Sequence, residues 1–510
     1  MHPITHAQTS PDKVALIDAD TGKTVSYRQL DELANQGAHA LRHLGLKRGE
    51  VVAVLLDNGF DIFDIAWAAQ RSGLYLTSIS TKFTASDVRY IVEDSGARVL
   101  IASDRLSSIA VAALDHLPRV RGFAATTEFA GLQGWKALRD SQPTAAIPDQ
   151  SAGTDMLYSS GTTGRPKGVR PPLPSGELGA ETPLMRMAAT LYDMGPETVY
   201  LSTSPLYHAA PQRWALTAQR MNGTVIFTDQ FDAERFLALI ERYRVTHSTF
   251  VPTHFIRMLK LPPEVRERYG HSSLKAVIHA AAPCPVPVKH AMIEWWGPIV
   301  HEYYSGTETC GITALNSQEW LNKPGSVGRA VLGTVKITDD AGNELPPNQI
   351  GNVYFADGPR FEYHNDPAKT LEAYDQHGWA TMGDIGRIDE EGYLYLSDRK
   401  NFMIISGGVN IYPQEIENLI VTHPKVADVA VIGAPDEEMG EKVVAIVQPV
   451  DWTDAGAPFA EELRAFTRAA LGSIKCPRQF HFREVLPREP TGKLMKRLLR
   501  DDYRTLEQSR

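Results

Sequence analysis

The chain has 510 residues, of which 43% are hydrophobic and 22% charged, so we expect a globular protein with two or more domains. Its formal net charge of −9 argues against a nucleic-acid partner, and its 3 scattered cysteines exclude a disulfide framework. The N-terminus shows no basic segment followed by an apolar run, and no apolar stretch approaches the ~20 residues that span a bilayer. We therefore expect a soluble, cytoplasmic protein with neither a secretory signal nor a transmembrane segment.

Apolar stretches alternate with amphipathic segments along the N-terminal half. The apolar stretches predict strands at 14–17, 51–56, 74–79, 98–102, 198–203, 224–228, 247–251 and 275–280. Amphipathic segments predict helices at 27–44, 60–72 and 85–95, the first with Ser26 as its N-cap. Strands that are apolar throughout and alternate with helices form parallel sheets covered on both faces, which predicts the α/β class.

The C-terminal part of the chain repeats this alternation on a smaller scale. A helix predicted at 413–422 is followed by strands at 426–433 and 442–450 and by a helix at 459–471. We therefore predict a large N-terminal domain of layered, mostly parallel sheets with helices over residues 1–400. A small, mobile α/β domain is predicted to follow over residues 401–510.

Residues 158–169, Tyr-Ser-Ser-Gly-Thr-Thr-Gly-Arg-Pro-Lys-Gly-Val, combine glycines, hydroxyls and cations after a buried strand. Glycine lets the backbone turn tightly and bring its N–H groups close to a ligand, while hydroxyls and lysine supply further donors. The stretch is not a Walker A motif, because no Gly-Lys-Ser/Thr closes it. Many loops of this composition are plain solvent-exposed turns, but the Pro-Lys-Gly ending favours nucleotide phosphates. The predicted phosphate-binding residues are Ser159, Ser160, Gly161, Thr162, Thr163, Gly164 and Lys167.

This stretch resembles the phosphate loop of the acyl-adenylate-forming superfamily, which includes acyl-CoA synthetases, adenylation domains of peptide synthetases and firefly luciferase. The resemblance runs from about residue 10 to residue 503, with several motifs in the family's order. It implies ATP, Mg²⁺ and coenzyme A as cofactors and a carboxylic acid as substrate, and a homodimer is compatible with it. One segment departs from the family: residues 170–183 are rich in proline and glycine, which delays the next helix to about 184–194.

Two motifs imply contacts to the nucleoside. Ala281, Ala282 and Pro283 match a family stretch that packs flat against adenine, and small side chains permit such a close approach. Asp384 lies in a Gly-Asp turn that would otherwise be read as local capping. The residues around it match the family, which implies that Asp384 accepts the ribose hydroxyls and that Arg399 also contacts the ribose.

A further motif, Tyr303-Tyr-Ser-Gly-Thr-Glu308, resembles the family's Tyr-Gly-x-Thr-Glu. Ser305 stands where the family has glycine. By this match Tyr304 stacks on adenine, Thr307 donates to the α-phosphate and Glu308 holds Mg²⁺. A single carboxylate is enough, because a magnesium ion that bridges phosphates keeps several of its waters.

His208 lies in Pro-Leu-Tyr-His-Ala-Ala-Pro, and a lone histidine of this kind is usually an ordinary turn residue. Because the surrounding residues match the family, the resemblance places His208 beside the acyl carboxylate. The acyl pocket is expected near residues 208–217, 251–256 and 303–313. These stretches are apolar to mildly polar, so we expect an apolar acid of fatty, aromatic or steroid type.

The C-terminal motifs concern catalysis and domain movement. Lys493 follows Thr-Gly where the family keeps its catalytic lysine, which bridges the substrate carboxylate and the phosphate. Gly407 and Gly408 match a loop that contacts the pantetheine arm of coenzyme A once the small domain has turned. Asn401 stands at the family's pivot, where the signature has Lys or Asp, and Phe402 replaces the acid that follows.

Together these motifs predict an enzyme that forms an acyl-adenylate from ATP and a carboxylic acid and then transfers the acyl group to coenzyme A. Positioning and charge stabilisation would supply the catalysis. Three alternatives stay open: a ligase that loads a carrier protein, a luciferase-type oxidation on the same fold, and a non-enzymatic acyl- or nucleotide-binding relative. The presence of Lys493, Glu308 and Asp384 argues against the last.

Overall fold

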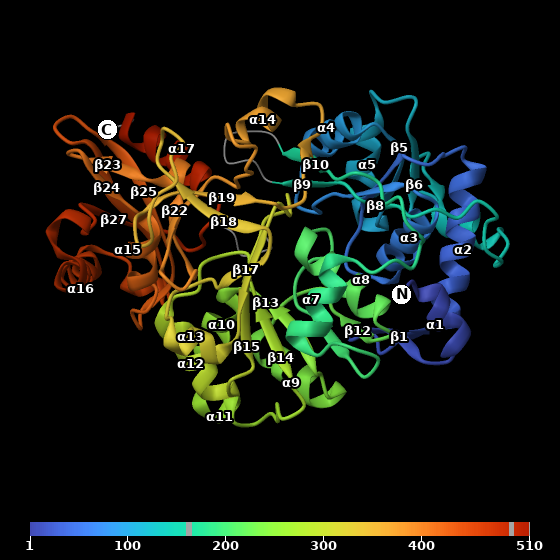
Figure 1. Ribbon diagram of the computed structural model, residues 1–510, viewed down its shortest axis with the longest axis horizontal. Coiled ribbons are helices and arrows are strands. Elements are labelled where there is room, and N and C mark those ends of the chain that lie inside the picture. The colour runs from blue at the N-terminus through green and yellow to red at the C-terminus, as the bar shows by residue number, and fades with distance from the viewer. Residues whose placement is uncertain (160–165, 489–493, 509–510) are drawn as a thin grey trace. The chain divides into compact units, whose positions relative to one another are not determined.

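The computed structural model describes the backbone of residues 1–159, 166–488 and 494–508, and side chains within these ranges up to Tyr503 (Figure 1). Backbone contacts group the chain into two compact units. The first unit comprises Met1–Phe250, Leu261–Ile278 and Arg360–Thr370, and the second Val251–Lys260, His279–Pro359 and Leu371–Arg510. Both contain sheets and helices, which confirms the predicted α/β class. The boundary predicted after residue 400 falls inside the second unit and stays a prediction.

The first unit contains a six-stranded sheet in the order β7-β6-β5-β3-β4-β8. Each neighbouring pair of strands in it is parallel. Its strands are β3 (Val51–Leu55), β4 (Tyr75–Ser78), β5 (Ala97–Ala102), β6 (Arg121–Ala124), β7 (Gln133–Gly134) and β8 (Thr154–Asp155). β3 and β4 are buried along their whole length, as expected of strands with a helix layer on each face.

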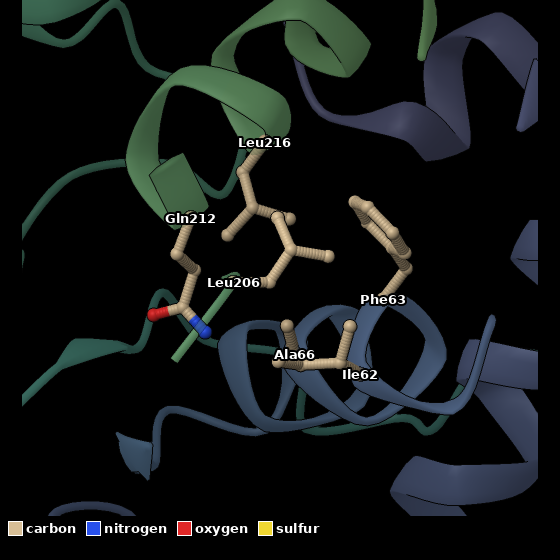
Figure 2. Close-up of a pocket in the computed structure, with 6 residues that line it drawn as sticks. All are labelled: Ile62, Phe63, Ala66, Leu206, Gln212 and Leu216. Carbon is tan, nitrogen blue, oxygen red and sulfur yellow. The ribbon is translucent and has the colours of Figure 1, made fainter. Parts of the chain in front are cut away.

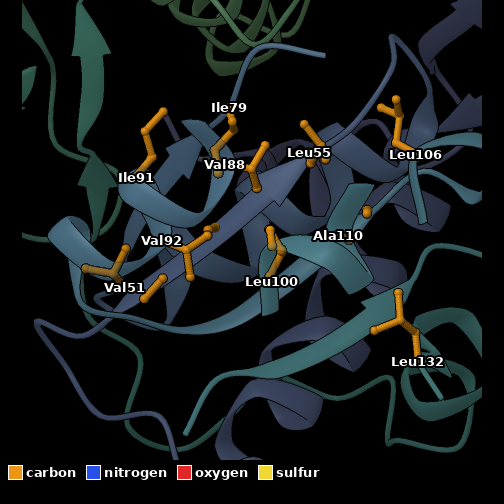
Figure 3. Packing of buried hydrophobic residues seen from close by; sticks show 14 of the residues in the cluster. Val51, Leu55, Ile79, Val88, Ile91, Val92, Leu100, Leu106, Ala110 and Leu132 are labelled. Carbon is orange, nitrogen blue, oxygen red and sulfur yellow. The ribbon is translucent and has the colours of Figure 1, made fainter. Parts of the chain in front are cut away.

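Helices pack on this sheet and complete a hydrophobic core. They are α2 (Tyr27–His43), α3 (Phe60–Arg71), α4 (Ala85–Ser95), α5 (Ser107–Leu114) and α6 (Trp135–Asp140). α2 and α4 each begin with a capping box, which satisfies backbone N–H groups that the first helical turn leaves free. α4 buries Val88, Ile91 and Val92, which join Leu55 and Leu100 of the strands in one cluster (Figure 3).

A second sheet of the first unit runs in the order β14-β13-β11-β12-β1-β2. Its strands are β1 (Val14–Asp18), β2 (Thr24–Ser26), β11 (Val199–Ser202), β12 (Thr224–Phe227), β13 (His247–Phe250) and β14 (Ala276–His279). The helices of this part are α1 (Pro3–Thr9), α7 (Pro183–Tyr192), α8 (Ala209–Arg220), α9 (Ala233–Tyr243) and α11 (Pro263–Arg266). α7 begins only after the proline-rich segment, with Thr182 as its N-cap, which confirms the predicted delay. A small antiparallel sheet joins β9 (Leu157–Ser159), β10 (Lys167–Arg170) and β20 (Glu362–Tyr363).

Antiparallel strands dominate the second unit. One run consists of β15 (Val300–Tyr304), β16 (Ile312–Leu315) and β17 (Arg329–Leu332). A four-stranded sheet consists of β18 (Thr334–Thr338), β19 (Gly351–Ala356), β21 (Asp384–Ile388) and β22 (Leu394–Arg399). The helices here are α10 (Pro252–Leu259), α12 (Val286–Trp296) and α13 (Ser317–Asn322), and α14 spans Pro367–Glu372.

The C-terminal sheet is built around one long hairpin, β25 (Val426–Asp436) and β26 (Gly440–Pro449). It also contains β23 (Ile404–Ser406), β24 (Val409–Ile411) and β27 (Gln479–Phe482). Alternate residues of the hairpin face two clusters, one completed by α15 (Pro413–Ile420) and α16 (Ala457–Lys475), the other by α17 (Lys496–Gln508). The predicted helices and strands of this region are confirmed. Gly472 leaves the helical conformation at a φ of +75°, where the helix predicted at 459–471 was expected to end. Each described helix is too short or too polar to cross a bilayer.

Candidate nucleotide site

The predicted phosphate loop is flanked by two paired strands of the first unit. β9 and β10 run antiparallel, and Ser159 lies opposite Lys167. Gly168 lies opposite Tyr158, and a Cβ at Gly168 would come within 2.9 Å of the Tyr158 ring, so a larger residue there would displace that ring. The other predicted phosphate ligands lie outside the described residues, and their contacts stay predictions: Ser160, Gly161, Thr162, Thr163 and Gly164.

Three residues predicted to contact the nucleoside meet in the second unit. Tyr304 ends β15, Asp384 begins β21, and Arg399 ends β22, where it pairs with Asp384 in the strand register. The Tyr304 hydroxyl donates to Asp384 Oδ2 at 2.5 Å, and Arg399 Nε lies 3.4 Å from Asp384 Oδ1. Burial, followed by the Asp384 charge, raises the pKa of Tyr304 well above its usual value, so the phenol stays a donor. We call this group the nucleoside cluster.

The loop after Tyr304 is held in a tight turn by its own groups. Ser305, the residue that replaces the family's glycine, donates its hydroxyl to the Gly311 carbonyl at 2.8 Å. A Cβ at Gly306 would come within 2.5 Å of Met382 Sδ and 2.6 Å of Glu308 Oε2. Ser305 therefore adds a hydrogen bond across the base of the loop, while Gly306 provides the close approach that the turn requires.

Thr307 and Glu308 lie in this turn and are half-buried. The Thr307 carbonyl accepts from the Thr309 hydroxyl at 3.2 Å. Among the described residues no three His, Cys, Asp or Glu side chains gather into a cage for a metal ion. Glu308 as a single protein carboxylate fits a magnesium ion that takes its other ligands from phosphates and water.

The predicted adenine segment follows β14 and is exposed at Ala281 and Pro283, with Ala282 half-buried. Ala281 adopts a φ of +75°, in the left-handed region that residues other than glycine rarely occupy. The segment begins two residues after His279, which is fully buried. The loop therefore presents small side chains from a constrained backbone.

A buried ionic group, which the sequence motifs do not reveal, lies beside His279. Lys289 of α12 donates to Glu302 of β15 at 2.5 Å, and His279 Nε2 lies 3.4 Å from the same carboxylate oxygen. Burial, with the charge of Lys289 second, lowers the pKa of His279 well below its usual value, so the ring is neutral. The signal in the sequence is weak, because the segments that carry Lys289 and Glu302 contain further polar residues.

His208 and the expected acid-side residues lie in tightly packed surroundings. His208 is the N-cap residue of α8 and its ring lies 4.5 Å from that of Tyr207. Trp214, on the same helix, is 1% exposed and packs on Tyr192 of α7 at a centroid distance of 5.6 Å. Burial raises the pKa of the Cys310 thiol to about 12, so the thiol is neutral at physiological pH. Cys310 therefore contributes a small apolar surface and does not act as a nucleophile.

α8 also borders an apolar cavity of the first unit, shown in Figure 2. The lining residues come from α3, α8 and the segment before α8: Ile62, Phe63, Ala66, Leu206, Gln212 and Leu216. It contains about 150 Å³ of space between atoms, which includes space open to solvent, and it is nowhere wide enough for a water molecule. Gln212 is held beside it by a hydrogen bond to the Ser78 hydroxyl at 2.8 Å. In this conformation the cavity is a packing seam, too narrow for an acyl chain.

The predicted thiol loop is a two-residue hairpin turn between β23 and β24. Gly407 and Gly408 have φ values of +57° and +77°, as the turns that match the twist of a hairpin require. A Cβ at Gly407 would come within 2.3 Å of Met439, whereas nothing lies within 4 Å of one at Gly408. Gly408 therefore faces open space. Lys493 lies outside the described residues, and its role stays a prediction.

Two family descriptions match the chain. "AMP-binding enzyme" matches residues 4–360, and "AMP-binding enzyme C-terminal domain" matches residues 415–493. The long-chain-fatty-acid–CoA ligase FadD13 of Mycobacterium tuberculosis is 34% identical, over 98% of this chain and 97% of its own length. The fatty acid–acyl-carrier-protein ligase ScoC of Streptomyces coeruleorubidus is 32% identical, over 98% of this chain and 95% of its own.

A solved structure with the same fold contains an acyl-adenylate. It is o-succinylbenzoate CoA synthetase from Bacillus subtilis in complex with its acyl-adenylate intermediate. The two structures align with a TM-score of 0.82 at 26% identity, covering 98% of this chain and 97% of that one.

Proposed function

We propose a reaction from the premise that this chain belongs to the family of AMP-binding enzymes and is an acid–thiol ligase. In this proposal an apolar carboxylic acid reacts with ATP to give an acyl-adenylate and pyrophosphate, and coenzyme A then displaces AMP to give a thioester. The observation that carries it is the nucleoside cluster, where Tyr304, Asp384 and Arg399 from three strand ends meet within hydrogen-bonding and ion-pair distance.

In the first half-reaction a carboxylate oxygen attacks the α-phosphorus, and the bond from that phosphorus to the pyrophosphate oxygen breaks. A carboxylate is ionised at neutral pH, so no general base is needed. Catalysis then rests on alignment and on donors aimed at the charge that develops on the phosphate oxygens. Thr307 would donate to the α-phosphate, Lys493 would bridge carboxylate and phosphate, and residues 159–168 would hold the pyrophosphate end.

Glu308 would hold the magnesium ion, which when bound neutralises charge on the phosphates. Tyr304 and the small residues of the adenine segment would enclose the base. Asp384 would accept hydrogen bonds from the ribose hydroxyls, with Arg399 orienting its carboxylate. The ribose hydroxyls would donate to the same Asp384 oxygens that Tyr304 and Arg399 contact. The Asp384 carboxylate therefore has partners both before and after the nucleotide binds, and binding leaves no unpaired charge buried.

In the second half-reaction the sulfur of coenzyme A attacks the acyl carbon and a C–S bond forms. The acyl C–O bond of the mixed anhydride breaks, AMP leaves with its electron pair, and the thiol proton is released to water. The glycine turn at Gly407 and Gly408 would line the path of the pantetheine arm. The open space beside Gly408 supports this role, because a residue without a side chain leaves room for the pantetheine arm to pass close to the backbone.

The acid is proposed to be apolar and of fatty, aromatic or steroid type. Buried Trp214, Phe255 and Cys310 in the predicted acid-side segments support an apolar environment. The FadD13 ligase among the similar proteins is named for long-chain fatty acids, which are apolar acids of the first type. The test is pyrophosphate release over a panel of fatty, aromatic, steroid and short dicarboxylic acids, with and without coenzyme A. Preference for the short dicarboxylic acids would overturn the apolar assignment.

A carrier protein is the second candidate acceptor, because a carrier-protein ligase is 32% identical over nearly the whole chain. The same assay decides between the two acceptors if phosphopantetheinylated carrier protein replaces coenzyme A. We expect thioester formation with coenzyme A to exceed that with carrier protein at equal concentrations, and the reverse ratio would favour the carrier-protein ligase.

A further inference from the structure

Phe402 lies where the linker enters the C-terminal sheet. It ends a short 3₁₀ helix, η2 (Lys400–Phe402), two residues before β23, and its side chain is half-buried. The family signature has an acidic residue at this position, so a phenylalanine is unexpected. A neighbouring cation that would form an ion pair with an acid can interact here only with the face of an aromatic ring.

Two cations of α17 lie over the Phe402 ring. Lys496 Nζ is 5.3 Å and the Arg500 guanidinium carbon 5.8 Å from the ring centroid. The two are four residues apart, so they occupy one face of the helix. Arg500 also donates to the Asn401 carbonyl at 3.3 Å. A ring face attracts cations through its quadrupole, most strongly where water is partly excluded, and Lys496 is 5% exposed.

α17 is in turn fixed to the C-terminal sheet. Leu499 and Tyr503 are buried in the cluster on one face of the β25–β26 hairpin. Lys496 lies 2.8 Å from Glu417 of α15, and that buried carboxylate also accepts from the Val431 backbone of β25 at 2.6 Å. The helix therefore connects Phe402 to two elements of the C-terminal sheet.

Lys400, two residues before Phe402, is attached to a different sheet. The backbone N–H of Lys400 donates to the Gly383 carbonyl at 3.0 Å, and its side chain donates to Asp340 at 2.7 Å. Both partners flank strands of the four-stranded sheet, β18 and β21. Between Lys400 and Asn401 the chain thus changes its attachment from one sheet to the other.

We propose that Phe402, Lys496 and Arg500 form a cation–π latch that positions α17 against the linker. The consequence of the latch for catalysis rests on the proposed function, because Lys493, the predicted catalytic lysine, precedes Lys496 by three residues in the sequence. All three are positioning residues. Because only adenylate formation uses Lys493, the latch should matter for that half-reaction and far less for thioester formation.

The experiment compares Phe402→Leu, which keeps an apolar side chain without a ring, with Phe402→Tyr, which keeps the ring. Adenylate formation is measured as pyrophosphate release at saturating ATP and acid, and thioester formation from supplied acyl-adenylate. Phe402→Leu should lower the first rate about five- to tenfold, as expected for the loss of two cation–π contacts, and leave the second within about twofold. Phe402→Tyr should keep both rates near wild type.

Arg500→Met and Arg497→Met provide a matched pair on the same helix, since Arg497 is exposed. The first should lower adenylate formation about threefold and the second should leave it unchanged. Equal effects of the two arginine variants, equal rates for the Leu and Tyr variants, or equal loss in both half-reactions would each overturn the latch.

Amide hydrogen exchange tests the latch without relying on the proposed reaction. Phe402→Leu should speed exchange at residues 401–404 and at the start of α17, and Phe402→Tyr should not. If the wild-type protein forms no acyl-adenylate from any acid, the proposed function fails while this comparison still decides the latch. Identical exchange in the two Phe402 variants would overturn it.

Discussion

The nucleoside cluster and helix α8, where the acid side of the site is predicted, are built in opposite ways. In the cluster, Tyr304, Asp384 and Arg399 are polar groups whose partners are each other. On α8, Trp214 is buried by packing against Tyr192, and selectivity there would come from the volume of side chains. Substitutions in the cluster should therefore affect every acid equally through ATP, and substitutions on α8 should change which acid is used.

Lys493→Ala should have the largest effect, because this lysine is predicted to serve both regions by bridging carboxylate and phosphate. Adenylate formation should fall by at least ~10²-fold, the usual cost of removing a donor from a developing charge. Thioester formation from supplied acyl-adenylate should change little. A parallel fall in both half-reactions, with a lowered melting temperature, would indicate misfolding.

Gly408→Leu should impair the reaction with the thiol and leave both the nucleoside cluster and helix α8 unaffected. The side chain would enter the open space beside the turn and obstruct the pantetheine arm, so thioester formation should fall more than ~tenfold while pyrophosphate release continues. Acyl-adenylate should then accumulate, which chromatography of the reaction would detect. Coenzyme A consumption at the wild-type rate would remove Gly408 from the thiol path.

Asp384→Asn tests the nucleotide side alone. The asparagine side chain has nearly the same shape as the aspartate and can still accept a hydrogen bond from Tyr304. It lacks the negative charge that attracts Arg399 and strengthens the hydrogen bonds from the ribose hydroxyls. KM for ATP should rise about tenfold, in line with a lost hydrogen bond to a charged group, and by the same factor with every acid. An increase that depends on the acid would show that the two regions are not independent.

Trp214→Leu tests the acid side and should have the smallest effect. Removing part of the indole beside Tyr192 frees volume, so the ratio of kcat/KM for a bulkier over a smaller acid should rise about fivefold. KM for ATP should stay within about twofold of wild type. Trp214→Phe is the milder control, and an unchanged acid ratio in both variants would place Trp214 outside the acid site.

Much of the fold follows from local pattern. The predicted strands at 51–56, 74–79 and 98–102 each agree with the observed strands to within one residue at either end, because a buried parallel strand must be apolar throughout. The late start of α7 follows from the prolines before it. For the site, motif matching predicted Ser159 and Lys167 as members of the phosphate loop, and the structure places them opposite each other on β9 and β10, the strands that flank it. Their contacts to phosphate stay predictions.

The sequence by itself determined the α/β class and the order of the helices and strands that it predicted, in the N-terminal half and at the C-terminus. It did not predict the antiparallel strands from β15 to β22. Only the tertiary structure decided which polar groups meet. Tyr304 and Asp384 are 80 residues apart, and Asn401 and Arg500 are 99 apart, yet each pair shares a hydrogen bond. Hydrophobic periodicity predicts which face of a helix or strand is buried. Which residue a buried side chain contacts depends on strand register and on how the sheets and helices pack.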